Sequence, residues 1–99
     1  MTYKNDCVDR IYILYKNYHD IKSLIYYENN ENMERFNNFI LFLDSNKDIN
    51  NDIKNILKNI ITNRAYYINP KMHEEFKIII KQTLSNIGES ILYEILNNI

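Results

Sequence analysis

The stretch KNDCVDRIYILYKNYHDIKSLIYY, residues 4–27, decides the fold class of this chain. Its apolar residues recur at spacings of four and three, which places them on one face of a helix. They are Cys7, Ile11, Leu14, Tyr18, Ile21 and Ile25. Because apolar and polar residues do not alternate at period two, the stretch predicts an amphipathic helix from Lys4 to Tyr27 rather than a strand.

Three further windows of the chain repeat this helical spacing. The predicted helices span residues 31–44, 49–64 and 69–99. Asp48 is the expected N-cap of the third helix. Asn69 is the expected N-cap of the fourth, with Pro70 at the first helical position, where its missing N–H costs nothing. Gly88 lies inside the fourth predicted helix and suggests a close contact with another helix.

Short connections at residues 28–30, 45–47 and 65–68 join these helices, so helices adjacent in sequence should be antiparallel neighbours in space. We therefore predict one all-α domain over residues 1–99, folded as an antiparallel up-down-up-down four-helix bundle. The core positions expected from the four apolar faces are Ile11, Leu14, Ile40, Ile56, Ile80 and Ile87. The apolar residues beside these faces, which could pack a second copy in a homo-oligomer, are Tyr12, Leu24, Phe39 and Phe42.

The composition is that of a globular protein with balanced charge. Of the 99 residues, 45% are hydrophobic and 25% are charged, and the formal net charge is −1. General nucleic-acid binding needs an excess of Lys and Arg, so no nucleic-acid partner is expected. The longest apolar run, residues 39–43, is far shorter than the roughly 20 residues of a membrane span. No secretory signal opens the chain and Cys7 is the lone cysteine, so we expect a cytoplasmic protein, at most peripheral at the inner face of the membrane.

Residues with catalytic or metal-binding potential are few and far apart. Cys7 and His19 lie about 18 Å apart along one predicted helix, too far for a nucleophile and its base. His73 opens the fourth predicted helix at the pole opposite Cys7. His19 and His73 would meet across the first and fourth helices, but two histidines alone make a weak metal site. We therefore expect no enzymatic activity, no cofactor and no metal.

The predicted topology brings two tyrosine pairs to one pole of the bundle, Tyr26-Tyr27 and Tyr66-Tyr67. His73 reaches the same pole. Lys77 and Lys81 share a helix face at spacing i, i+4, and Lys54 and Lys58 do the same, so these lysines form either a modest basic stripe toward anionic lipid or an acidic partner, or an ordinary solvated face. Two interpretations of the tyrosines stay open: rings that cap the core with wet hydroxyls, or anchors of a surface that binds a protein partner. The candidate binding residues are Tyr26, Tyr27, Tyr66, Tyr67, His73, Lys77 and Lys81.

The stretch INPKMHEEFKIIIKQTLSNIG, residues 68–88, resembles the last-helix region of pediocin-like bacteriocin immunity proteins, the enterocin A immunity group in particular. In that family a short loop opens a long final helix, which contains an L-S-x-I-G-like segment matched here by residues 84–88. The resemblance covers about a quarter of the chain at the level of residues. The chain length and the predicted bundle also agree with the family.

The resemblance implies a cytosolic protein that protects a producing bacterium from its own pore-forming peptide. Members of the family are thought to act at the membrane-embedded sugar-transport receptor that the peptide uses, with specificity in the C-terminal half, here residues 54–94. A second hypothesis fits the residues equally well: a small virus- or phage-encoded helical protein that inhibits a host factor. The residues Asn, Ile, Tyr and Lys, whose codons are AT-rich, dominate the chain and agree with either source.

Overall fold

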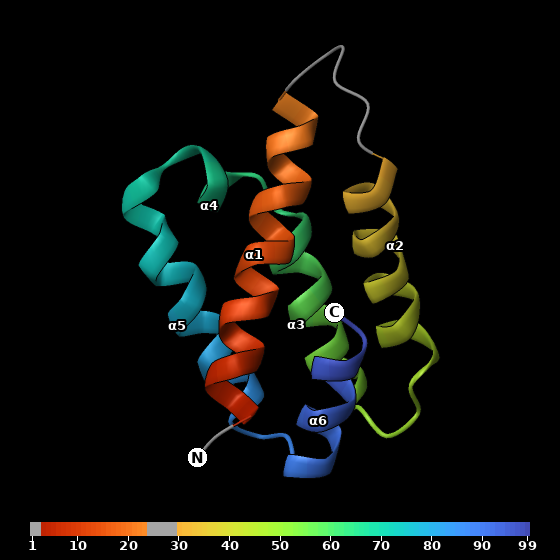
Figure 1. Ribbon diagram of the computed structural model, residues 1–99. Coiled ribbons are helices and arrows are strands. Elements are labelled where there is room, and N and C mark those ends of the chain that lie inside the picture. The colour runs from red at the N-terminus through yellow and green to blue at the C-terminus, as the bar shows by residue number, and fades with distance from the viewer. Residues whose placement is uncertain (1–2, 24–29) are drawn as a thin grey trace.

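The computed structural model describes residues 3–23 and 30–99, and every regular element in this part of the chain is helical (Figure 1). In order, the elements are α1 Tyr3–Ser23, α2 Asn30–Ser45, α3 Asn51–Thr62, α4 Ala65–Ile68, the 3-10 helix η1 Pro70–Met72, α5 His73–Leu84 and α6 Glu89–Asn97. The predicted all-α class is therefore confirmed. None of the described helices combines the length and the apolar character that crossing a membrane requires.

Helix α1 is the centre of the arrangement, because it contacts α2, α5 and α6. Helix α3 contacts α2 and α5, and Figure 1 shows α5 and α2 on opposite sides of α1. The predicted bundle of four helices is not confirmed. The last predicted helix is instead two helices, α5 and α6, which both pack against α1, so the described chain has one long helix more than a four-helix bundle.

The core is built from aliphatic and aromatic side chains of all five longer helices. Ile11, Leu14 and Ile80 are buried as predicted, whereas Ile40 and Ile87 are half-buried residues that pack against the core. The hydrophobic side chains with no exposed surface are Cys7, Ile11, Phe39, Leu43, Leu57, Ile61, Phe76, Ile80, Leu84 and Ile95. The single core thus combines residues from both ends of the sequence.

The apolar face predicted for the third helix, Ile49, Ile53, Ile56 and Ile60, is wrong only at Ile56, because Ile49 and Ile60 are buried and Ile53 packs against the core. Ile56 is 45% exposed, while Leu57 and Ile61 are fully buried at spacing i, i+4. The buried face of α3 thus includes Leu57 and Ile61 beside the predicted Ile53 and Ile60. Lys54 lies three residues before Leu57 on the same face, so its aliphatic stem is buried and the residue is not part of an exposed stripe.

The apolar residues that sequence spacing assigned to a second copy are mostly occupied within the chain. Phe39 is fully buried, so its assignment to an interface between copies is wrong. Tyr12 and Phe42 are half-buried against the core. Leu24 lies outside the described residues. The structure therefore supplies no support for a homo-oligomer at these positions.

The predicted single helix from residue 69 to the C-terminus is wrong, because α5 ends at Leu84 and α6 begins at Glu89. The backbone N–H of Ser85 is shared between the carbonyls of Lys81 at 3.0 Å and Gln82 at 3.3 Å, which tightens the last turn. Gly88 has the extended backbone of an N-cap, and a Cβ there would meet nothing within 4 Å. The glycine therefore starts α6 and does not mark a close helix contact.

The break lets α6 fold back onto α1. Leu92 and Ile95 of α6 are buried, and the thiol of Cys7 donates a hydrogen bond to the Leu92 carbonyl at 3.3 Å. A continuous helix would extend these residues away from α1 along the α5 axis. The turn at 85–88 is thus what brings the end of the chain against its beginning.

The start of α3 and the start of η1 show how asparagines set the helix boundaries. The predicted N-cap Asp48 is wrong, since the Asn50 side chain accepts the bond from the Asp52 N–H at 2.7 Å. The predicted cap Asn69 is confirmed: its side chain accepts from the Lys71 N–H at 3.1 Å, and Pro70 follows it. Residues 65–68, expected as a loop, form the short helix α4.

Candidate functional site

The candidate binding residues are only partly brought together. Tyr66 and Tyr67 lie on α4, and His73, Lys77 and Lys81 lie on α5. Tyr26 and Tyr27 lie outside the described residues, so their meeting with the α4 tyrosines stays a prediction. The site described below therefore consists of α4, the start of α5 and the face of α1 that they contact.

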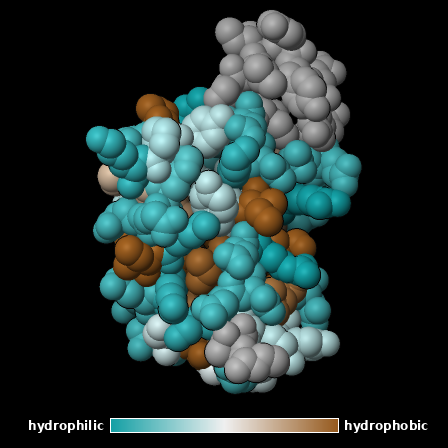
Figure 2. Space-filling view, turned by 60° about the vertical axis from the view of Figure 1, so that its left-hand side comes forward, coloured by the Kyte–Doolittle hydropathy of each residue, from teal (hydrophilic) through white to brown (hydrophobic). Residues whose placement is uncertain are grey.

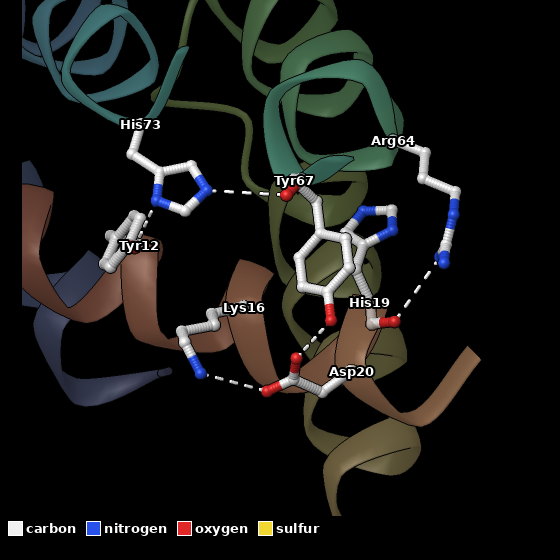
Figure 3. A network of polar contacts seen from close by, with 7 residues as sticks. All are labelled: Tyr12, Lys16, His19, Asp20, Arg64, Tyr67 and His73. Carbon is white, nitrogen blue, oxygen red and sulfur yellow. Dashed lines mark hydrogen bonds and ion pairs between the residues drawn. The ribbon is translucent and has the colours of Figure 1, made fainter. Parts of the chain in front are cut away.

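Tyr67 fastens α4 to α1 (Figure 3). Its hydroxyl donates a hydrogen bond to the carboxylate of Asp20. Its ring stacks on the ring of the buried His19, with centroids 5.8 Å apart, and the Arg64 guanidinium lies 5.2 Å from its centroid. An aromatic ring held by a hydrogen bond, a stacked ring and a cation has little rotational freedom. The main role of Tyr67 is therefore to hold α4 against α1.

The Asp20 carboxylate is shared between two donors. It accepts from the Tyr67 hydroxyl and from the Lys16 ammonium, whose Nζ lies 3.1 Å from Oδ2. Partial burial alone would raise the pKa of Asp20, but the two hydrogen bonds outweigh it and lower the pKa below its usual value. The hydrogen bond between Lys16 and Asp20 also raises the pKa of Lys16. Both groups are therefore held in their charged forms at neutral pH.

His73 bridges α5, α4 and α1. Its Nε2 lies 3.4 Å from the Tyr67 carbonyl, and its Nδ1 lies 3.2 Å from the Tyr12 hydroxyl. A carbonyl can only accept, so Nε2 donates to it, and in the neutral imidazole Nδ1 then accepts from the Tyr12 hydroxyl. The Lys77 ammonium lies 4.6 Å from the centre of the Tyr12 ring, at cation–π distance. His73 and Lys77 are thus engaged with Tyr12 inside the chain.

Behind these contacts lies an aromatic cluster that sequence reasoning did not assign to the site. Phe76 is fully buried and meets the rings of Tyr15, at 4.3 Å, and Tyr66, at 6.0 Å between centroids. The Tyr15 hydroxyl donates to the Asn63 carbonyl, and burial raises the pKa of Tyr15 to about 12. Tyr12, Tyr15 and His19 follow the three-and-four spacing of one helix face, which is the signal that could have identified them.

Nucleophilic and metal-binding groups do not gather at this cluster. Cys7 is fully buried elsewhere on α1, and burial raises the pKa of its thiol to about 11, which disfavours the thiolate. Within residues 3–23 and 30–99, no three His, Cys, Asp or Glu side chains are placed to hold a metal ion. The arrangement fixes the position of α4 and α5 on α1, and its polar groups are largely satisfied by one another.

A hollow between α1 and α5, here called the α1–α5 groove, contains two of the candidate residues. It is about 430 Å³ in volume and is lined by Asn5, Val8, Asp9, Glu74, Lys77, Ile78 and Lys81. Ile78 is 47% exposed, and its charged neighbours are two lysines and two carboxylates. Figure 2 shows the side of the molecule that carries α4 and α5, where small hydrophobic patches alternate with hydrophilic surface.

The predicted basic stripe does not form as one surface. Lys58 on α3 pairs with Asp44 of α2 at 2.6 Å, and Lys54 is buried. Lys77 and Lys81 on α5 line the hollow against α1 instead. The two lysine pairs therefore face different neighbouring helices, and the second pair shares its surface with two acidic residues.

Comparison with known proteins adds no relative: no family model, no curated protein and no solved structure matches this chain.

Proposed function

We propose that this chain is a non-enzymatic binding protein and that the α1–α5 groove, with the adjoining α4 surface, contacts a protein partner. The observation that carries the proposal is the position of Ile78. It is a half-exposed isoleucine in an open hollow, with Lys77, Lys81, Asp9 and Glu74 on the lining. Apolar side chains at the centre and charged ones at the rim are typical of protein interfaces.

The charges of the groove favour a protein over a nucleic acid. Two lysines and two carboxylates line the same hollow, so the lining has no net charge. A polyphosphate backbone is attracted by an excess of positive charge, whereas mixed charges select a partner with a matching pattern. Mixed charge at the rim contributes mainly to specificity and to the rate of association.

The fastening of α4 and α5 supports the same proposal. Tyr67 bonds Asp20 and His73 bonds Tyr12, so the walls of the groove are held before a partner arrives. A surface that is already ordered loses less conformational entropy on binding than a mobile one. Tyr66, which is half-buried against Phe76, extends this ordered surface toward α4.

The nature of the partner is proposed from the resemblance. The segment that resembles immunity proteins, residues 68–88, runs through α5 and includes Lys77, Ile78 and Lys81. It favours immunity to a bacteriocin, exercised at a membrane-embedded receptor approached from the cytosol. One implied feature is missing, because the L-S-x-I-G-like segment forms the break after α5 and not the interior of a long helix. Inhibition of a host factor by a virus- or phage-encoded protein is the alternative.

The test compares two exposed isoleucines, Ile78→Asp in the groove and Ile56→Asp on α3, which are 47% and 45% exposed. The chain is expressed in bacteria sensitive to a pediocin-like peptide, and survival is measured. We expect Ile78→Asp to abolish protection and Ile56→Asp to retain it. If the unaltered chain gives no protection, capture of a partner from host cells with the same two variants tests the inhibitor alternative. Equal binding by both variants would refute the groove as the contact surface.

A further inference from the structure

A second hollow lies on the α2 side of α1, and we call it the arginine groove. Its lining residues are Arg10, Ile13, Leu14 and Asn17 of α1, Asn32 and Arg35 of α2, and Ile99. Its volume is about 250 Å³. The α1 residues share one helix face, and it differs from the face that lines the α1–α5 groove. Figure 1 shows the C-terminal end of the chain between α1 and α2.

The apolar part of the arginine groove is open to solvent. Leu14 is buried, whereas Ile13 is 55% exposed and Ile99 is partly exposed. The isoleucines therefore keep apolar surface in contact with water at the edge of a concave site. Covering them with an apolar side chain would remove that surface from water, which favours binding.

The charged part of the arginine groove is positive. No Asp or Glu is among the described residues that line it. Arg10 forms no ion pair with any residue in the described ranges. Arg35 pairs with Glu31 at 2.6 Å, but their side chains are 62% and 71% exposed, so this bond exchanges readily with water or another carboxylate.

Two guanidinium groups on facing helices complement a carboxylate. Arginine binds a carboxylate through two parallel hydrogen bonds, which a lysine cannot reproduce. Because Ile13 and Ile99 are partly exposed, an apolar group beside that carboxylate would pack against them. The hollow is about 250 Å³ in volume and open to solvent, so it admits a few side chains that project from a larger partner.

We propose that the arginine groove binds an amphipathic helical segment of a partner protein, with a Glu or Asp within one helical turn of a Leu or Ile. Residues three or four apart on a helix are neighbours, so such a segment presents both groups on one face. The proposal is independent of the α1–α5 groove, because different residues of α1 line the two hollows.

The test is an NMR titration of the isotope-labelled chain with two synthetic peptides, each about 14 residues long so that a helix can form. One peptide carries Glu and Leu four residues apart along a single face, and the other has Gln in place of each Glu. We expect saturable shifts of the Ile13 and Asn17 amides with the Glu peptide. The Gln peptide should bind at least about tenfold more weakly, since the charge-assisted bonds are lost.

Matched variants of the chain separate the groove from general charge. Arg10→Gln with Arg35→Gln should weaken binding of the Glu peptide at least about tenfold. Lys47→Gln with Lys71→Gln removes the same charge at exposed positions outside the groove and should leave binding unchanged. Circular dichroism should be the same for both, because all four side chains are exposed.

Four results would overturn the proposal. The first is equal binding of the Glu and Gln peptides, and the second is no loss of binding in the arginine variant. The third is no saturable binding of the Glu peptide up to about millimolar concentration. A dimer of the unaltered chain that the arginine variant dissociates, seen by sedimentation velocity, would identify the occupant as a second copy and would equally overturn it.

Discussion

The two sides of α1 are joined to their neighbours in different ways. Toward α4 and α5, directional bonds cross between helices, from Tyr67 to Asp20 and between Tyr12 and His73. Toward α2, the two helices contact one another over several residues, among them the rings of Tyr18 and Phe36, which stack with centroids 3.6 Å apart and an interplanar angle of 10°. We call these the bonded side and the stacked side of α1.

The difference separates structural charges from charges available to a partner. On the bonded side, Lys16 and Asp20 are neutralised by one another and hold helix α4 in place. On the stacked side, Arg10 has no ion pair within the described residues, and it borders a hollow. A carboxylate that joins two helices, such as Asp20, is costly to recruit for binding, whereas an exposed arginine at the edge of a hollow can bind a partner without releasing a contact between helices.

The largest expected effect is at the centre of the bonded side. Phe76→Ala removes a fully buried ring that meets the rings of Tyr12, Tyr15 and Tyr66. We expect it to lower the free energy of unfolding by about 3–5 kcal/mol, through lost transfer energy and the cavity left behind. Ile56→Ala, at an isoleucine that is 45% exposed, should cost less than about 1 kcal/mol. Denaturant titration measures both, and equal losses would contradict the core described above.

The next effect tests the bond between α4 and α1. Tyr67→Phe keeps the ring but removes the hydroxyl that donates to Asp20, and we expect a loss of about 1–2 kcal/mol in the free energy of unfolding. Tyr93→Phe is the matched control, since Tyr93 is 51% exposed, and it should stay within about 0.5 kcal/mol. If the two variants lose the same stability, the bonded side is not distinguished from ordinary surface.

A smaller effect should appear as a dependence of stability on pH. The pKa of Asp20 is lowered in the folded chain, against a usual value of 3.8. A carboxylate whose pKa is lower in the folded chain than in the unfolded chain stabilises the folded state at pH values above the unfolded pKa. This contribution is lost as the pH falls through the folded pKa. The folded chain should therefore lose part of its stability below about pH 4. Asp20→Asn should remove this component, while Asp48→Asn, at an exposed carboxyl, should keep it.

The smallest effect is expected at the arginine groove. Arg10→Gln with Arg35→Gln should change the free energy of unfolding by less than about 0.5 kcal/mol, because an exposed ion pair contributes little. Thermal unfolding measures this change. A large loss of stability would mean that the two arginines stabilise the folded chain. Charged groups would then hold the stacked side together, as they do on the bonded side.

The sequence allows the helical class, most of the α1 face and the start at Asn69 and Pro70 to be predicted, since these depend on local spacing and capping. The break after Leu84 was not predictable from spacing, because the apolar positions Thr83, Ile87 and Ile91 continue the four-residue repeat across it. Ser85 and Gly88 were the signals that mark the turn. The error at Ile56 in α3 has a related reason: residues 56, 57, 60 and 61 are all apolar, and only packing selects which of them turn inward.

The contact between Tyr67 and His73 was predictable, but the bonds that hold these residues to α1 were not. Tyr66, Tyr67 and His73 were assigned to one pole, and Tyr67 and His73 do contact one another. Their partners Asp20 and Tyr12 are 47 and 61 residues away in sequence. No local pattern encodes contacts at that separation, so the tie between α4 and α1 follows only from the fold.

The most direct test of the bonded side is a double-mutant cycle on the Tyr67–Asp20 hydrogen bond. The free energy of unfolding is measured for the unaltered chain, Tyr67→Phe, Asp20→Asn and the double variant, at neutral pH. A bond that fastens α4 to α1 should give a coupling energy of about 1 kcal/mol, so the double variant loses less than the sum of the single losses. Losses that add within about 0.3 kcal/mol would show that the bond does not hold α4 in place and would contradict the account.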